Sequence, residues 1–399
     1  PRASDPAAHQ RYPPTSLQPA SGATCTDKMA TGPTDQELAQ TGVEGLDEVL
    51  LGGFTPQRLY LLEGTPGAGK TTLALQFLLE GVRRGETVIY ITLSETEEEI
   101  HAVAASHGWS LDGIHLRELV AGDGAMDPDA EYTVFHPSEV ELGTTTRLIR
   151  DDVERLQPTR LVLDSLSELR LLAGDALRYR RQILALKHYF AGRHCTVLLL
   201  DDLTGNAPDL HTHSIAHGVV LLEQETRPYG NQRRRLSILK LRGRQFRSGY
   251  HDYDIRRGGL VVYPRLVAAE HRGKHHGGQI ASGIAELDAL LGGGIERGSS
   301  TLITGAAGTA KSTLAATFAR AVADRGEHAA LFLFDEASQT LRGRMRALGL
   351  SLDEHVEAGR IILRQVDPAE LSPGEFSTLV RQAVVEHQAK LLVVDSLNG

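Results

Sequence analysis

Short runs of apolar residues alternate with segments of helical periodicity from residue 37 onward. Residues 58–63, 88–93 and 160–164 are compact apolar runs typical of buried strands. Residues 72–82 instead repeat their apolar positions at helical spacing. This alternation predicts an α/β fold with a mostly parallel sheet flanked by helices.

The chain repeats itself over this pattern. Counterparts lie 241 positions apart, as Gly42 and Gly283, Gly64 and Gly305, Lys70 and Lys311, and Glu95 and Glu336 do. Residues 163–166 match residues 394–397 at a shorter offset of 231. A period of this length indicates a duplicated domain rather than a solenoid. We expect the first copy at 37–269, a linker at 270–279 and the second copy at 280–399.

The two ends of the chain depart from this two-copy organisation. Residues 1–36 are rich in Pro, Ser, Ala and Thr and have almost no apolar periodicity, which predicts a disordered tail. Met29, shortly before the patterned sequence, is a candidate start of translation. The second copy stops four residues after Asp395, whereas the first continues far beyond Asp164. We therefore expect an incomplete second copy and a longer parent protein.

A glycine-rich loop joins the strand at 58–63 to the helix at 72–82. Its sequence, Gly64-Thr-Pro-Gly-Ala-Gly-Lys-Thr71, is a P-loop in the context that such loops require. Backbone N–H groups would face the phosphates of a nucleotide, Lys70 would reach its β- and γ-phosphates, and Thr71 would ligate Mg²⁺. The expected phosphate-binding residues are Gly64, Gly67, Ala68, Gly69, Lys70, Thr71 and Thr72, and in the second copy Gly305, Gly308, Thr309, Ala310, Lys311, Ser312 and Thr313.

Ala310 stands where the first copy has Gly69. Loops of this type often place a residue of positive φ near that position, which a Cβ penalises by about 1–2 kcal/mol. The second site is therefore expected to tolerate this cost or to bind more weakly.

Acidic residues follow two of the apolar strands. Asp164 ends the strand at 160–164 as a Walker B carboxylate does, and Asp395 is its counterpart. We expect Mg²⁺ to lie between Thr71 and Asp164, and between Ser312 and Asp395. Glu95 follows the strand at 88–93, at the edge where parallel sheets bind ligands, and is the candidate base for an attacking water, with Glu336 as counterpart.

Glu95 has a second interpretation as a cap of the helix that starts near Thr96. For the three following glutamates, Glu97, Glu98 and Glu99, the capping role is the better expectation.

A basic strand is predicted at residues 233–243. A period of two would place Ile238, Lys240 and Arg242 on one face. Two such cations could clamp the phosphates of their own nucleotide or of a neighbouring subunit's, and a solvated basic strand is the alternative. His211 and His213, in a predicted loop, and the linker pair at 275–276 lack zinc-binding partners and are expected at the surface.

Composition narrows the class of protein. The 399 residues hold 42 Lys and Arg against 51 Asp and Glu, a net charge of −9. This charge argues against a protein that coats nucleic acid or anionic lipid. The two cysteines suit a reducing cytoplasm, and no apolar run approaches the roughly 20 residues that a membrane-spanning helix needs.

Several motifs together resemble one family. The opening at 41–53, Glu95 followed by Thr96, the run at 106–109 and the run at 238–243 are similar to the KaiC group of RecA-like P-loop ATPases. The resemblance implies a RecA-like fold in two tandem copies, ATP with Mg²⁺, and a homo-hexameric ring with nucleotide between subunits. It also implies that Ser106 lies near the nucleotide and that Lys240, Leu241 and Arg242 approach it across the interface.

The leading functional hypothesis is a slow cytoplasmic ATPase that signals to protein partners through ATP-dependent ring assembly. The serine/threonine pair that the resemblance would make an autokinase substrate lies beyond the Asp-bearing strand of the second domain, so only a longer parent would carry it. A nucleotide-gated scaffold is the alternative, because Ser94 stands where the family has an acidic residue. A RecA-type DNA-dependent ATPase is third.

Overall fold

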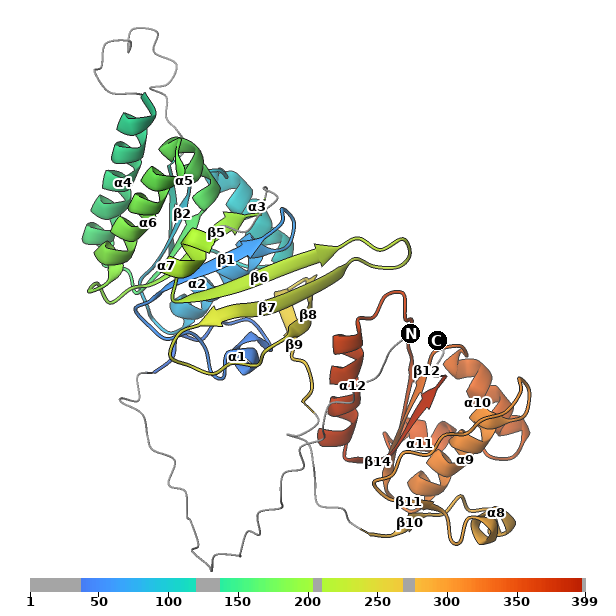
Figure 1. Ribbon diagram of the computed structural model, residues 1–399. Helices are drawn as coiled ribbons and strands as arrows, with labels where there is room; N and C mark the ends of the chain where they lie inside the picture. Colours follow the sequence, from blue (N-terminus) through green and yellow to red (C-terminus); the bar gives the residue numbers. More distant parts are fainter. Residues whose placement is uncertain (1–36, 120–136, 204–209, 268–276, 397–399) are drawn as a thin grey trace, which may run out of the picture. The chain divides into compact units, whose positions relative to one another are not determined.

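The computed structural model describes residues 37–119, 137–203, 210–267 and 277–396 (Figure 1). The tail expected at 1–36 lies outside these residues, as does most of the linker expected at 270–279. Gln279, which we placed in the linker, opens strand β10 (Gln279–Ile280).

The first copy is built on a nine-stranded sheet. Its spatial order is β3 (Ile114–Glu118), β2 (Val88–Thr92), β4 (Arg160–Asp164), β5 (Thr196–Asp202), β1 (Leu59–Gly64), β6 (Gly218–Glu225), β7 (Arg233–Leu241), β8 (Tyr250–Arg256) and β9 (Gly259–Tyr263). The strands from β3 to β6 are parallel, and those from β6 to β9 pair antiparallel. The predicted mostly parallel α/β sheet is confirmed.

Helices cover both faces of this sheet. The first face packs against α1 (Leu46–Val49), α2 (Lys70–Arg83) and α3 (Glu97–His107). The second packs against α4 (Pro137–Leu156), α5 (Leu166–Ala173), α6 (Ala176–Phe190) and α7 (Leu210–Ile215). Every residue of β1, β2 and β4 is therefore buried, which explains their continuous apolar runs.

The second copy contains part of the same architecture. Its elements are β10, α8 (Ala285–Leu290), β11 (Ile295–Glu296), α9 (Lys311–Asp324), β12 (His328–Leu333), α10 (Ser338–Ala347), α11 (Asp353–Glu357), β13 (Ile361–Gln365), α12 (Pro373–Val385) and β14 (Ala389–Asp395). The parallel order β13-β12-β14 repeats the order β3-β2-β4 of the first copy.

The segment before the second P-loop forms no strand. Its counterpart β1 lies between β5 and β6, and both follow Asp164 in the first copy. Residues 300–305 pair with no strand among the described residues, and Leu302 is 69% exposed.

The repeat extends to hydrogen bonds. In the first copy, the Thr41 N–H donates to Asp47 Oδ1 and the Val43 N–H donates to Thr41 Oγ1, at 2.9 and 3.2 Å. In the second copy, Ser282 and Asp288 make the equivalent bond at 2.6 Å. Each carboxylate thereby fixes the turn that precedes a short helix.

Strand β7 departs from the expected alternation. Val219 pairs with Lys240 and Val220 with Ile238, so Leu239 is an extra residue that forms a β-bulge. Ile238 therefore packs in the core on the first face, whereas Lys240 and Arg242 reach α7 on the second. The expectation that Ile238 shares their face is wrong, because the bulge shifts the alternation by one residue.

No helix in the described ranges is long and apolar enough to cross a membrane.

Arg160 at the start of β4 is a buried charge that ties three segments together. Its guanidinium donates to both carboxylate oxygens of Glu86, at 2.7 and 2.8 Å, and to the backbone oxygens of Gln40 and Phe77. The side chain is 1% exposed and lies over the Phe77 ring.

Arg160→Met is expected to lower the free energy of unfolding by about 3–5 kcal/mol, because it leaves Glu86 and two carbonyls without their partner. Urea unfolding measures this loss. Arg155→Met removes a side chain that is 65% exposed and paired with Asp152, and should cost less than about 1 kcal/mol. Equal effects of the two changes would contradict the buried role of Arg160.

Candidate nucleotide site

The P-loop lies at the centre of the carboxyl edge of the first sheet. It connects β1 to α2, and Gly69 at the N-cap of α2 has φ of 92°. The positive φ favours glycine at this position, and a Cβ on Gly69 would lie 2.6 Å from Ile255 Cδ1, so that methyl group would have to move. Ala310 occupies the matching N-cap of α9 with φ of 65°. The positive φ expected at this position is present, and Ala310 carries its cost.

Lys70 is held inside this loop. Its Nζ donates to the backbone oxygens of Gly64 and Thr65, at 3.0 and 3.1 Å, and forms an ion pair with Asp202 Oδ1 at 2.6 Å. Asp202 ends β5, the strand next to β1, and its register partner is Gly64. Sequence analysis missed Asp202, although the apolar run of β5 ending in Asp201 and Asp202 carries the same signal as the run that ends in Asp164.

Asp164 ends β4, which is separated from β1 and its P-loop by one strand, β5. Its Oδ2 accepts a hydrogen bond from the Tyr90 hydroxyl at 2.5 Å and from Thr71 Oγ1 at 3.4 Å. Burial raises the pKa of Asp164, and burial beside this carboxylate raises the pKa of Tyr90 well above its usual value. The structure thus brings Thr71 and Asp164 together as the sequence predicts, and adds Tyr90.

Glu95 lies three residues after the end of β2, at the same carboxyl edge of the sheet. The hydroxyl of Thr92 fixes its turn, accepting from the Glu95 N–H at 2.9 Å. Its Oε2 is buried and has no hydrogen-bond partner among the residues that the structure describes. Burial, reinforced by the negative charge of Asp164, raises the pKa of Glu95 to about 7.

The cap of α3 is made by other residues. Thr96 Oγ1 accepts from the Glu99 N–H at 3.3 Å, and Glu99 Oε2 accepts from the Thr96 N–H at 2.8 Å, which is a capping box. The capping role expected of Glu99 is confirmed, and the alternative role of Glu95 as the cap is not needed.

Lys240 and Arg242 lie at the opposite edge of the sheet. The Arg242 N–H donates to His217 O, and the His217 N–H donates to Leu59 O at the first residue of β1. Gly64 and the P-loop are at the other end of that strand, so these cations cannot reach the nucleotide of their own copy. Leu241, which lies between them in the sequence, has its side chain buried in the core.

The last turn of α7 holds these cations in place. Lys240 Nζ donates to His213 O and Ala216 O, Arg242 to Ser214 O, and Lys187 Nζ to Ile215 O. Burial and the charge of Arg242 lower the pKa values of Lys240 and Lys187. These side chains form an α7 cluster of cations beside the last carbonyl groups of the helix, where positive charge is favoured, and Arg242 remains exposed.

His213 differs from our expectation. It lies on α7 rather than in a loop, and its Nε2 contacts both carboxylate oxygens of the buried Glu63, at 2.7 and 2.8 Å. Pairing with a buried carboxylate explains why the side chain is only 17% exposed rather than at the surface. The side chain of His211 and the pair at 275–276 are outside the described residues.

Comparison with known proteins identifies this arrangement. The sequence profile described as "ATPase: KaiC" matches residues 39–267 and 280–399. The chain belongs to the KaiC ATPase family. It is 29% identical over 367 residues to the circadian clock oscillator protein KaiC of Picosynechococcus sp., which covers 90% of this chain and 70% of that protein. It is 26% identical over 368 residues to the circadian clock protein KaiC3 of Synechocystis sp., covering 91% and 72%.

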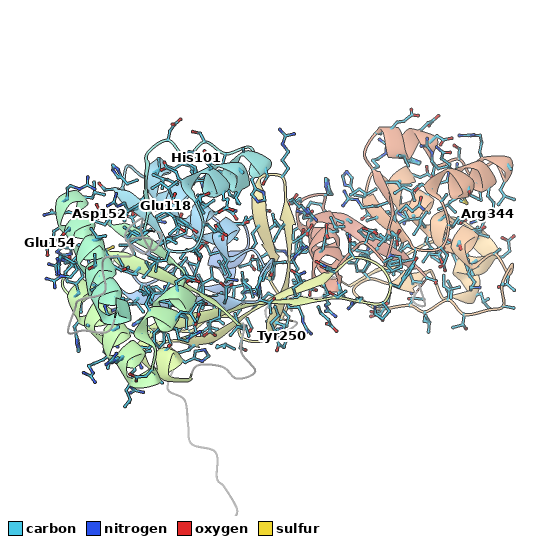
Figure 2. All side chains as sticks on the ribbon, turned by 90° about the horizontal axis from the view of Figure 1, so that it is seen from above. His101, Glu118, Asp152, Glu154, Tyr250 and Arg344 are labelled. Carbon is cyan, nitrogen blue, oxygen red and sulfur yellow. The ribbon has the colours of Figure 1, made fainter. Side chains whose placement is uncertain are left out.

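The second KaiC-family copy keeps the loop but not its surroundings. Lys311 Nζ donates to Gly305 O and Ala306 O, as Lys70 does to its own loop. Glu336, however, forms a two-pronged ion pair with Arg344 at 2.6 and 2.8 Å, and Arg344 (labelled in Figure 2) replaces Val103 of the first copy. The candidate base Glu336 is thus ion-paired with a residue of α10. Glu95, by contrast, has a buried carboxylate oxygen without a hydrogen-bond partner among the described residues.

Ser106 lies on α3, where its hydroxyl donates to Val103 O at 2.7 Å. Its neighbour His107 places Nε2 3.4 Å from Thr72 Oγ1 at the start of α2. The segment is therefore adjacent to the helix that follows the P-loop.

The oxygen donors fit the magnesium ion that KaiC-family ATPases use. Thr71 Oγ1 and Asp164 Oδ2 are already neighbours, and Mg²⁺ prefers one or two such protein ligands together with substrate phosphates. The described residues contain no group of three or more His, Cys, Asp or Glu side chains able to hold a metal by themselves.

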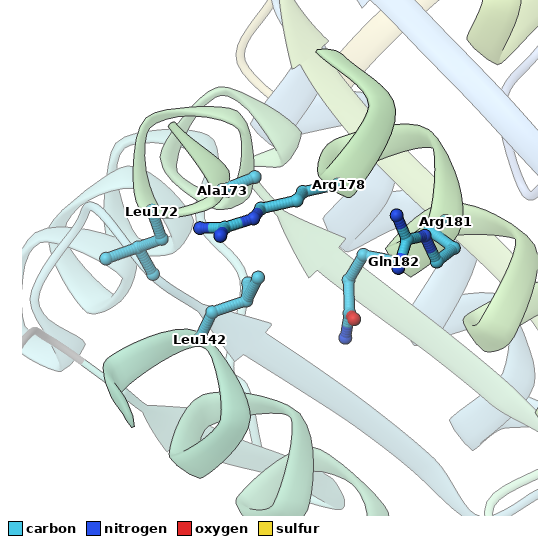
Figure 3. A pocket seen from close by; sticks show the side chains of 6 residues that line it. All are labelled: Leu142, Leu172, Ala173, Arg178, Arg181 and Gln182. Atoms are coloured by element: carbon cyan, nitrogen blue, oxygen red, sulfur yellow. The ribbon is translucent and has the colours of Figure 1, made fainter. Parts of the chain in front are cut away.

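A separate hollow lies among α4, α5 and α6 (Figure 3). Its lining contains none of the P-loop residues and none of the acids described above. The lining residues are Leu142, Leu172, Ala173, Arg178, Arg181 and Gln182.

Asp202→Asn is expected to tighten binding of a non-hydrolysable ATP analogue by about three- to tenfold, because it removes both the ion pair that holds Lys70 and a charge that repels phosphate. Calorimetry measures this affinity. The same change at Asp151, on the exposed side of α4, should leave it unaltered. Weaker binding by Asp202→Asn would mean that Asp202 instead supports the nucleotide.

Proposed function

We propose that the first copy hydrolyses ATP slowly by in-line attack of water, with Glu95 as the general base. The observation that carries the proposal is the buried, unpartnered Oε2 of Glu95, on a carboxylate whose pKa is raised to about 7. A base with a pKa near the working pH takes a proton from water effectively, and about half of the molecules carry it in the ionised form at that pH.

The remaining residues of the site serve binding and orientation. Lys70 exchanges Asp202 and the loop carbonyls for the β- and γ-phosphates. The backbone of residues 67–72 donates N–H groups to the phosphates, aided by the positive end of α2. Thr71 and Asp164 would hold Mg²⁺, which when bound neutralises charge on the phosphate oxygens.

The cations of the α7 cluster act on a neighbouring molecule in this proposal. Lys240 and Arg242 lie at the amino edge of the sheet, away from their own P-loop, and would stabilise the charge that develops on a neighbour's phosphates. Self-association in a homo-hexameric ring, as the KaiC resemblance implies, supplies that neighbour. Assembly of this ring on ATP would present a surface to signalling proteins.

We assign turnover to the first copy rather than the second. Ala310 carries a positive φ and Glu336 is paired with Arg344. Both features weaken the second site as a hydrolase. Autokinase activity would belong to a longer parent protein, and we do not propose it for these residues.

A nucleotide-gated scaffold is the alternative function. Ser94 lies exposed beside Glu95 and supplies no second carboxylate to the site. A chain that binds ATP and assembles without releasing phosphate would have this function.

Steady-state phosphate release distinguishes the two. Glu95→Gln is expected to lower the Mg²⁺-dependent rate by about 100-fold or more while ATP binding persists. Glu97→Gln alters an exposed residue two positions away, at the start of α3, and should keep the wild-type rate. The wild-type rate should rise with pH through about 7 and then level, because Glu95 must lose its proton to act.

The outcome that rejects hydrolysis is a wild-type chain that binds ATP but releases no phosphate at any pH. A rate that Glu95→Gln leaves unchanged would reject Glu95 as the base while retaining the ATPase.

A further inference from the structure

Tyr90 lies at the middle of β2 and is completely buried, with an exposed fraction of 0%. Its register partner on the adjacent strand β4 is Val162, two residues before Asp164. Side chains two residues apart on a strand point to the same face, so Tyr90 and Asp164 face one side of the sheet. This places the hydroxyl 2.5 Å from Asp164 Oδ2.

The hydrogen bond leaves the two oxygens of Asp164 unequal. Oδ2 accepts from Tyr90 and, more weakly, from Thr71 at 3.4 Å. Oδ1 receives no hydrogen bond from any side chain among the contacts described. A buried carboxylate with one oxygen fixed by a donor cannot rotate freely about its terminal torsion, which is otherwise broad. The second oxygen therefore points in one direction.

The second copy lacks this arrangement. Leu331 stands 241 positions after Tyr90 and is buried in β12, so it fills the core without offering a donor. An apolar residue thus satisfies the packing at this position. The hydroxyl of Tyr90 is an addition that packing does not require, and an unbonded hydroxyl in this core would cost about 1–3 kcal/mol.

We propose that Tyr90 is a positioning residue that orients the Asp164 carboxylate for the magnesium ion of a bound Mg²⁺–ATP complex. The inference rests on the proposed nucleotide site, and it adds a residue from β2 that acts through Asp164. Tyr90 itself touches neither nucleotide nor metal.

Tyr90→Phe tests this role because it removes only the hydroxyl. The measured quantity is the affinity for a non-hydrolysable ATP analogue, determined by calorimetry once with saturating Mg²⁺ and once with EDTA. The ratio of the two affinities reports how strongly the metal contributes to binding. This ratio is expected to fall by about three- to tenfold in Tyr90→Phe, with the EDTA affinity unchanged.

Tyr60→Phe is the matched control. Tyr60 is also fully buried in a central strand, but its hydroxyl donates to Thr55 O at 2.9 Å, away from the acids. It should leave the ratio unchanged. An unaltered ratio in Tyr90→Phe would overturn the positioning role, whether both affinities stay the same or both fall equally.

Failure of the underlying site gives a different result. If the wild-type chain binds the analogue equally with Mg²⁺ and with EDTA, the proposed Mg²⁺ site itself is wrong. If the wild-type ratio is large and Tyr90→Phe preserves it, only the role of Tyr90 is wrong.

Discussion

The position of β1 between β5 and β6 determines the rest of this structure. Both neighbours are parallel to β1 and both come later in the chain, so the P-loop strand joins the sheet by pairing with strands that are distant in sequence. In the first copy this pairing buries all of β1 and places the P-loop beside Asp202. In the second copy the equivalent residues 300–305 pair with no strand in the described part of the chain.

Electrostatics at the carboxyl edge follows from the same strand order. Glu95 follows the end of β2, Asp164 and Asp202 end β4 and β5, and Lys70 lies among these carboxylates. Burial raises the pKa values of Glu95 and Asp164, and the negative charges of the neighbouring carboxylates add to the rise. Glu336 in the second copy has an ion-pair partner, Arg344. A bound Mg²⁺ ion would supply positive charge beside these carboxylates.

Much of this fold could be predicted from local sequence. The apolar runs ending in Asp164 and leading into Gly64 indicated buried strands, and the P-loop lies between its strand and helix as expected. The contacts that sequence analysis missed are those made between strands or helices distant in the chain. Tyr90 reaches Asp164 only because β2 pairs with β4, and His213 reaches Glu63 only because α7 packs across β1. The bulge at Leu239 was also missed, because its cause is the register with β6 and the basic run has no local sign of it.

A crystal structure with Mg²⁺ and a non-hydrolysable ATP analogue tests the account most directly. The account predicts the triphosphate in the first P-loop, with Lys70 moved from Asp202 to the phosphates and Glu95 facing the γ-phosphate through a water. It also predicts that Lys240 and Arg242 of an adjacent molecule approach the same nucleotide. A nucleotide bound elsewhere, or Lys70 still paired with Asp202 beside a bound triphosphate, would contradict it.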